Sequence, residues 1–249
     1  MVKYLNAECY KLTHRKNYLL GFFGFLLGGI AAFLLLCKYN AGDGASLNFF
    51  LVNLPSLLTT GLFLLLMISD MVFSDQYKFN TLKNEVSYGL PRLRIYFGKL
   101  IATGAAAVVF CLIIILFYTG VAAVLFPAEE GLPEVLEYVG KFLLLSLPLW
   151  MGGLGFNYML LFVMKVSNAA TVVYMLVMAL AGTVVDLLEM IQPKLWNMLE
   201  TIRDCLLTTP FNRMDVAAEA IGHAWLVGMG WLVITTLIGI TVFQKREIN

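Results

Sequence analysis

Charged side chains are scarce in this sequence. Only 13% of its 249 residues are Asp, Glu, Lys or Arg, whereas 60% are hydrophobic. A soluble domain of this size carries roughly 25% charged and about 45–50% apolar residues. The apolar residues gather in runs of about 18 or more, the length that spans a membrane as a helix. The composition therefore excludes a soluble globular domain, and without a basic domain outside the membrane it argues against nucleic-acid binding.

Residues that commonly carry metal or catalytic chemistry are also few. The two histidines, His14 and His223, stand in no Glu-x-x-His or His-x-x-x-His pattern, and the four cysteines form no Cys-x-x-Cys pair. There is no Gly-x-Ser-x-Gly turn. The Gly-Lys pairs at 98–99 and 140–141 lack the earlier glycine and the following Ser or Thr of a phosphate-binding loop. We therefore expect no enzyme activity in this chain and no metal or cofactor bound by it.

Ionisable residues are missing from the middle of the long apolar runs. Asp70 and Asp186 come nearest, but each lies toward the end of a run, where a carboxylate can snorkel or cap at the interface. The sequence has no ladder of buried charges of the kind that a proton pump or cation channel uses. Its two halves also share no pair of broken helices, the mark of inverted-repeat carriers. A stand-alone secondary carrier is therefore disfavoured.

What the sequence does contain is six apolar runs, which predict an all-α polytopic membrane protein with a single transmembrane domain over residues 1–249. The runs cover 18–37, 50–73, 97–126, 140–164, 168–188 and 221–243. Before them, residues 1–17 place four apolar residues from Val2 to Leu12 at helical spacing, which predicts a helix in the membrane interface. The alternative is a plain basic flank that only fixes orientation. In the fourth run, the glycines of 152–155 permit a neighbouring helix to approach closely.

Lysine and arginine are distributed unevenly between the two ends of these runs. If the amino terminus is cytoplasmic, the segments on that side hold 12 of the 17 Lys and Arg residues. Four glutamates, Glu129, Glu130, Glu134 and Glu137, crowd one loop on the opposite side. Because cytoplasmic loops carry the excess of basic residues, we predict that both termini are cytoplasmic.

The outer segment 189–220 differs from an ordinary loop. Six apolar residues recur at helical spacing from Ile191 to Leu206 with polar residues opposite, and Thr208-Thr209-Pro210 interrupts the pattern. This pattern predicts an outer amphipathic helix before the last span. It is either a cap that closes the outer end of a pathway or a loop that rests on lipid.

One polar stretch, Ser74–Lys99, separates the second and third runs and holds five basic residues against two acidic ones. It resembles the first cytoplasmic loop of ABC-2-type transporter permeases. The matching positions are Asp75-Gln76-Tyr77-Lys78, Thr81-Leu82-Lys83-Asn84, Ser87-Tyr88-Gly89, Arg92, Ile95-Tyr96 and Gly98-Lys99, with Gln76 in place of the usual Glu and Asn80 in place of the usual Gly. The chain length and the phrase Val-Ser-Tyr-Gly-Leu-Pro-Arg at 86–92 are most similar to the small bacterial lantibiotic-immunity and bacitracin-resistance permeases.

The resemblance implies a half-transporter in the bacterial cytoplasmic membrane. Two permease subunits, a second copy of this chain or a homologous one, would pair with two copies of a cytoplasmic ABC ATPase subunit that binds ATP and Mg. The chain itself would be the membrane-spanning subunit of an ATP-driven exporter within the lipid bilayer. Its cargo would be an antimicrobial, lantibiotic-like peptide or another amphipathic compound.

The resemblance also implies that the loop at 74–96 couples the ATPase to the membrane helices. Residues 75–86 can form a short helix with Asp75 near its amino end, where the helix dipole favours an acid. Phe79 and Leu82 share one face that can fill an apolar notch of the partner. The predicted coupling residues are Asp75, Gln76, Lys78, Phe79, Thr81, Leu82, Lys83, Glu85 and Arg92. The alternative is a solvated basic loop that serves only topology.

A transport pathway is expected first on the second and fifth spans, which line the dimer interface in the resembled family. The predicted pathway residues are Asn53, Thr59, Thr60, Thr171, Tyr174 and Met178. One other class of function stays open: a non-transporting membrane sensor or assembly partner, whose loop would dock a different cytoplasmic protein.

Overall fold

The computed structural model describes residues 2–14, 16–41, 44–78, 81–164 and 166–245. Its elements are α1 (Val2–Thr13), α2 (Lys16–Ala41), α3 (Leu47–Val52), α4 (Leu54–Lys78), α5 (Thr81–Ser87), α6 (Arg92–Leu125), α7 (Leu132–Met164), α8 (Ser167–Ile191), the 3-10 turn η1 (Pro193–Leu195), α9 (Trp196–Asp204), α10 (Thr209–Arg213) and α11 (Ala218–Lys245). Over these residues the chain is 88% helical and has no strand, and six helices are long and apolar enough to cross a membrane. The predicted all-α polytopic fold with six spanning helices is confirmed.

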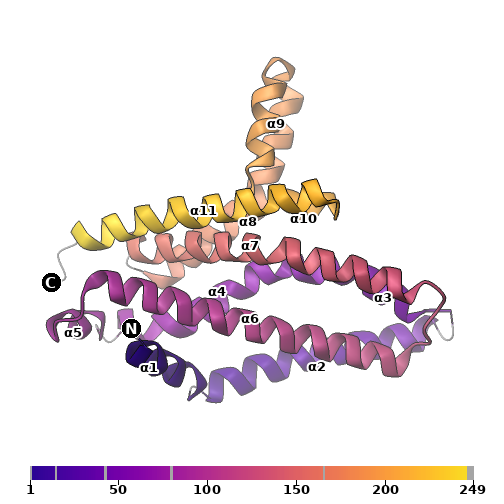
Figure 1. Cartoon of the computed structure of the whole chain (residues 1–249), viewed down its shortest axis with the longest axis horizontal. Coiled ribbons are helices and arrows are strands. Elements are labelled where there is room, and N and C mark those ends of the chain that lie inside the picture. Colours follow the sequence, from indigo (N-terminus) through magenta and orange to yellow (C-terminus); the bar gives the residue numbers. More distant parts are fainter. Residues whose placement is uncertain (1, 15, 42–43, 79–80, 165, 246–249) are drawn as a thin grey trace.

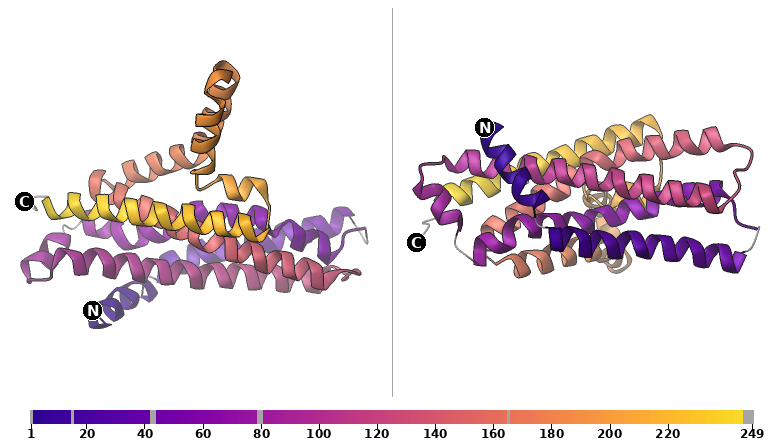
Figure 2. Two further views of the ribbon diagram at one scale, coloured as in Figure 1. Left: turned by 45° about the horizontal axis from the view of Figure 1, so that its top comes forward. Right: turned by 90° about the horizontal axis from the view of Figure 1, so that it is seen from below.

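The bundle has two distinct ends. Helices α2, α4, α6, α7 and α11 run along one long direction (Figure 1). At one end lie α1, α5 and the last turns of α11, and we call this the α5 end (Figures 1 and 2). The opposite end, called the α3 end, carries α3 and the connection between α6 and α7. The helices nearest the two termini therefore share one end of the bundle.

Helix α7 lies at the centre of the bundle. In an apolar 18-residue stretch of α7, 72% of the residues are buried, against 6% to 44% in the corresponding stretches of the other spanning helices. It packs against α11, α4 and α8. Glycine makes the contact with α11 possible, because a Cβ at Gly228 would stand 2.2 Å from the Pro148 carbonyl oxygen, and one at Gly152 would stand 2.7 Å from the Gly228 carbonyl oxygen. The close helix approach predicted for the glycines of 152–155 is confirmed.

Side-chain hydrogen bonds fix α4 against its neighbours. The Trp150 indole N–H of α7 donates to the carbonyl oxygen of Leu58 at 3.0 Å, and the Tyr174 hydroxyl of α8 donates to that of Leu62 at 3.1 Å. At the α5 end, the Ser167 hydroxyl of α8 donates to the Asp70 carboxylate of α4. In a hydrocarbon environment no water competes for these groups, so such bonds hold the helices in register.

Proline sets several helix starts. Helix α3 stops at Val52 and α4 starts at Leu54, because Pro55 has no backbone N–H to donate and is best accommodated in the first turn of a helix. Pro91 is the N-cap of α6, which begins at Arg92. Helices α4, α6 and α7 are each longer than the apolar runs of the sequence, and α4 continues to Lys78.

The connection between α8 and α11 contains the shorter helices α9 and α10. Helix α9 lies across the direction of the bundle helices and extends away from them (Figure 1). Arg203 of α9 pairs with Asp186 at 2.6 Å and with Glu189, both on α8. Helix α9 ends at Asp204, and Pro210 stands in the first turn of α10. The predicted interruption is therefore present, and the amphipathic helix before it is shorter than the apolar pattern from Ile191 to Leu206.

Candidate functional site

The stretch predicted to couple the chain to a partner lies at the α5 end. Helix α4 includes Asp75 and ends at Lys78, and α5 then covers Thr81–Ser87. A single helix over 75–86 with Asp75 at its amino end is therefore wrong. The reason is local, because residues 74–78 contain no proline or glycine that would stop α4. A turn with Gly89 at φ 79° then leads into α6.

The predicted coupling residues differ in how far the structure describes them. Phe79 lies outside the described residues. The backbone alone is described for Asp75, Gln76, Lys78, Thr81, Leu82 and Lys83. The side chains of Glu85 and Arg92 are described, and they form hydrogen bonds with different helices.

Glu85 belongs to a buried charge cluster that joins three helices. The cluster consists of Tyr4, Glu8 and Lys11 of α1, Glu85 of α5 and Lys99 of α6. The Lys99 side chain is 0% exposed and that of Glu8 is 3% exposed. A buried lysine is rare unless it is paired. The cluster is therefore a specific link between the amino-terminal helix, the short helix α5 and the third span.

The ion pairs of this cluster are shared between two acids and two bases. Lys99 Nζ lies 3.1 Å from Glu8 Oε1 and 3.3 Å from Glu85 Oε1. Lys11 Nζ lies 2.7 Å and 3.3 Å from the same two oxygens. The Tyr4 hydroxyl donates to Glu85 Oε2 at 2.9 Å. Two carboxylates face two ammonium groups, so the cluster carries no net charge.

Gly98 provides the space in which α1 meets α6. A Cβ at this position would stand 2.5 Å from two carbons of the Tyr4 ring. The ring lies against the α6 backbone, with Lys99 Nζ 5.7 Å from its centroid, close enough for a cation–π attraction. The Gly98-Lys99 pair thus has two tasks, because the glycine admits α1 and the lysine binds it.

The cluster shifts the pKa values of its α1 members. Burial raises the pKa of the Glu8 carboxyl, but Lys99 and Lys11 outweigh burial, and the pKa lies below its ordinary value of 4.5. Burial lowers the pKa of Lys11, but Glu8 and Glu85 raise it above 10.5. Burial and the same two carboxylates raise the pKa of Tyr4, which keeps its hydroxyl proton as a donor. Glu8 and Lys11 are therefore both charged near neutral pH.

These shifts predict a wide pH range in which α1 stays docked. The depressed pKa of Glu8 gives stability that is present above pH 4.5 and lost as the pH falls through the lower, folded-state value. The raised pKa of Lys11 gives stability that is present below pH 10.5 and lost as the pH rises through the folded-state value. Spin labels on cysteines at the exposed positions Lys3 and Tyr88 should keep one separation between about pH 5 and pH 9, and move apart in acid below about pH 4. Separation that changes across neutral pH would contradict the pairing.

A hydrogen-bonded chain continues from the cluster to the central helix. The Tyr158 hydroxyl of α7, which is fully buried, donates to the Lys99 carbonyl oxygen at 3.0 Å and also bonds to the Thr103 hydroxyl. Lys99 therefore binds α1 and α5 through its side chain and α7 through its backbone carbonyl oxygen.

Arg92 contacts the last turn of α11. Its guanidinium donates to the carbonyl oxygens of Phe243 at 2.8 Å and Gln244 at 2.5 Å. Cationic donors at a helix C-terminus satisfy carbonyls that lack partners within the helix and complement the helix dipole. Arg92 thus ties α6 to α11 at the α5 end, away from the Glu85 cluster.

The residues predicted to line a pathway do not form one surface within this chain. Tyr174 and Met178 are buried, whereas Asn53 and Thr60 are exposed. Thr59 and Thr60 donate back to the carbonyl oxygens of their own helix, and Thr171 is half-buried on α8. Asn53 lines an apolar groove at the α3 end.

Sequence reasoning missed the buried charge cluster. Two signals were available: Glu8 is the one acid among the charged residues of the first 17, and Lys99 is the last charge before Glu129. Neither signal identifies the partner, because Glu8 and Lys99 are 91 positions apart and meet only through tertiary packing.

Together, the fold and the cluster define a polytopic helical membrane protein whose amino-terminal helix is joined to its first long polar loop. The family model for ABC-2 family transporter proteins matches residues 4–182, more than half of the chain, and this chain belongs to that family. Membership makes it a multi-pass membrane transport subunit rather than a catalytic enzyme, and implies that it works with an ATP-binding subunit. Among curated proteins, none matches the chain.

Proposed function

We propose that this chain is the permease subunit of an ATP-driven exporter in the bacterial cytoplasmic membrane, with both termini in the cytoplasm. Two copies of a separate ATPase subunit bind ATP and Mg and drive two permease subunits, which are identical or homologous. The cargo is an antimicrobial peptide or another amphipathic compound, as in the lantibiotic-immunity and bacitracin-resistance group. The family match over residues 4–182 is the observation that carries the proposal.

The α5 end provides the surface for the ATPase. Helix α5 lies at that end beside α1 and the last turns of α11 (Figure 2), and the loop that contains it is rich in lysine and arginine. A short helix on a basic loop can dock in a groove of a partner that has an acidic rim. Docking there supplies the contact through which ATP-driven movements of the partner reach the membrane helices.

The buried charge cluster carries such movements from α5 into the bundle. Glu85 of α5 is bound to Lys99 of α6, and Tyr158 of α7 holds the Lys99 carbonyl oxygen. Ionic and hydrogen-bonded contacts connect each of these helices to the next. Displacement of α5 therefore moves α1 and α6 with it and transmits force to the central helix α7. Interfacial α1 is therefore a moving part of the transporter as well as an anchor.

Replacing Leu82 with Asp tests the docking of α5. We expect Leu82→Asp to abolish stimulation of the partner ATPase and export of cargo, while membrane insertion stays normal, because a carboxylate cannot fill an apolar notch. ATP hydrolysis and cargo efflux are measured in reconstituted vesicles. Leu136→Asp is the matched control, since Leu136 is 52% exposed on α7 at the opposite end of the bundle.

The Leu82→Asp experiment distinguishes an ATP-driven exporter from a non-transporting membrane protein. Full activity of Leu82→Asp would remove α5 as the docking element. A bound ATPase without ATP-dependent movement of any cargo would instead favour the non-transporting sensor or assembly partner.

A further inference from the structure

An apolar groove opens between α2 and the α3–α4 pair near the α3 end of the bundle. Its volume is about 550 Å³, within the range of about 300–1,000 Å³ that is common for ligand sites. Phe25 and Phe33 of α2 face Phe49 of α3 across it, and these three rings are 83%, 56% and 60% exposed. The groove is thus a preformed apolar surface within a single chain.

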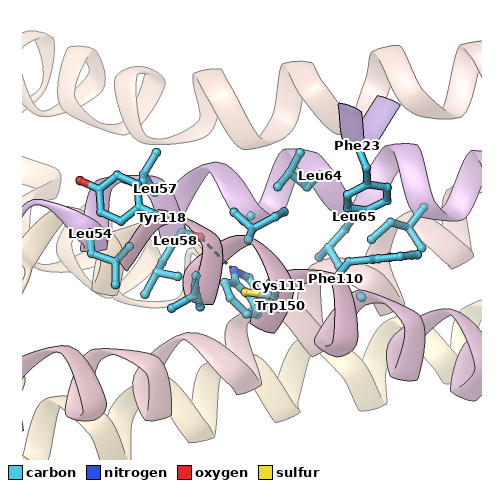
Figure 3. A pocket seen from close by; sticks show the side chains of 15 residues that line it. Phe23, Leu54, Leu57, Leu58, Leu64, Leu65, Phe110, Cys111, Tyr118 and Trp150 are labelled. Atoms are coloured by element: carbon cyan, nitrogen blue, oxygen red, sulfur yellow. Dashed lines mark hydrogen bonds between the residues drawn. The ribbon is translucent and has the colours of Figure 1, made fainter. Parts of the chain in front are cut away.

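The inner wall of the groove is rigid. Tyr118 of α6 lines it, and its hydroxyl donates to the Phe50 carbonyl oxygen at 3.0 Å, so the ring is fixed. Tyr118 and Leu57 also line a second, narrower apolar cavity of about 40 Å³ that reaches Trp150 (Figure 3). By contrast, only 6% of the spanning segment of α2 is buried. One wall of the groove is therefore built into the core, and the other wall is a loosely packed helix.

An acidic segment with Glu129 and Glu130 is bonded to α3, the helix that forms one wall of the groove. The Asn48 side chain of α3 donates to the carbonyl oxygens of Glu130 at 3.0 Å and Glu129 at 3.4 Å, and Leu47 N–H donates to the Pro127 carbonyl oxygen at 2.9 Å. Both glutamates are exposed, and neither forms an ion pair within the described part of the chain. One cation, Lys38, lies nearby with its Nζ 6.0 Å from the Phe126 ring centroid. Among these described residues, two acids stand against one base.

We propose that this groove binds a cationic amphipathic molecule, such as a basic amphipathic peptide. Its apolar side occupies the space between Phe25, Phe33 and Phe49, and its positive groups lie beside Glu129 and Glu130. The proposal rests on the proposed function and deepens it, because it assigns the cargo a charge and a binding site at the end opposite α5. Charge complementarity selects this occupant, since anionic amphiphiles would meet two carboxylates.

Two adjacent glycines of α2, which point in different directions from the helix, provide a test of the groove with a matched control. A Cβ at Gly29 or at Gly28 meets no other atom within 4 Å, so a larger side chain fits at either position. Gly29 lines the groove and Gly28 does not. Gly29→Trp therefore fills the groove, whereas Gly28→Trp adds the same side chain to the same helix outside it.

The experiment measures binding of a dansyl-labelled Lys/Leu amphipathic peptide to the full chain in phosphatidylcholine nanodiscs. We expect Gly29→Trp to weaken binding about tenfold and Gly28→Trp to leave it unchanged. The double change Glu129→Gln and Glu130→Gln should weaken it by roughly three- to tenfold and flatten its salt dependence. Glu200→Gln with Glu219→Gln, which alters the same net charge at exposed sites on α9 and α11, should have little effect.

Each other outcome has a definite meaning. Equal binding of a Glu/Leu peptide, or of a labelled phospholipid in competition, would make the groove an ordinary lipid contact and overturn the proposal. A changed oligomeric state in Gly29→Trp without weaker peptide binding would make it a contact with a second copy, which also overturns it. If ATP-driven export is normal in Gly29→Trp, the proposed binding site is wrong, but the proposed function stands. If the peptide binds but no ATP-driven export occurs, the proposed function is wrong, but the binding site stands.

Discussion

Lys99→Met should destabilise the protein by about 3–5 kcal/mol, the cost of removing one member of a buried ion-pair cluster. Met matches the length and shape of the lysine stem, so the change removes the ammonium group and little else. Glu8, which is 3% exposed, then shares only Lys11 with Glu85. We expect a lower midpoint of thermal unfolding in detergent and release of α1, measured by protease accessibility of the first 14 residues.

Two further variants show whether charge is the cause. Lys141→Met removes a lysine from an exposed pair with Glu137, and should change stability by less than about 1 kcal/mol. Combining Lys99→Met with Glu8→Gln and Glu85→Gln should recover part of the loss, because it removes two carboxylates that would otherwise share one ammonium group. A Lys99→Met protein as stable as the parent would contradict the account of the cluster.

Gly228→Ala should also have a large effect, although it adds a single methyl group. The new Cβ would stand 2.2 Å from the Pro148 carbonyl oxygen and 2.8 Å from the Leu149 nitrogen. These are backbone atoms of the central helix, so α7 and α11 must separate to relieve the contact. Overpacking of a tight core costs about 1–3 kcal/mol and sometimes more, and loss of the α7–α11 contact should appear as a lower unfolding midpoint.

Gly230→Ala separates this clash from helix propensity. It lies on the same helix two residues on, and a Cβ there meets nothing within 4 Å. Alanine favours the helix over glycine by up to about 1 kcal/mol, so Gly230→Ala should be neutral or stabilising. Equal behaviour of the two variants would show that α7 and α11 do not approach as closely as their glycines indicate.

Hydropathy and residue spacing were sufficient for the fold class. The apolar runs predict six spans because length and apolar character alone decide insertion into a membrane, and the glycines of 152–155 predict a close helix contact. The ends of the helices were harder to predict from the sequence. Polar residues such as those at 74–78 continue α4 beyond the hydrocarbon region, where no hydropathy signal can mark its end.

The site could be predicted only in outline. A motif at 74–99 identified the loop and placed Glu85 and Arg92 in it. It could not show that Arg92 binds the end of α11 or that Lys99 is buried against α1, because these partners lie far away in sequence. Pairings of this kind depend on how helices pack, and a single sequence carries no direct record of packing.

In the proposed transporter, a separate ATPase drives this chain through α5. The most direct measurement places a photo-crosslinking residue at position 82, isolates the chain from native membranes in mild detergent, and identifies what is attached. We expect a cytoplasmic subunit with a Gly-x-x-x-x-Gly-Lys-Ser/Thr loop, cross-linked at position 82 and not at position 136. Absence of any nucleotide-binding subunit, or cross-links only at position 136, would contradict it.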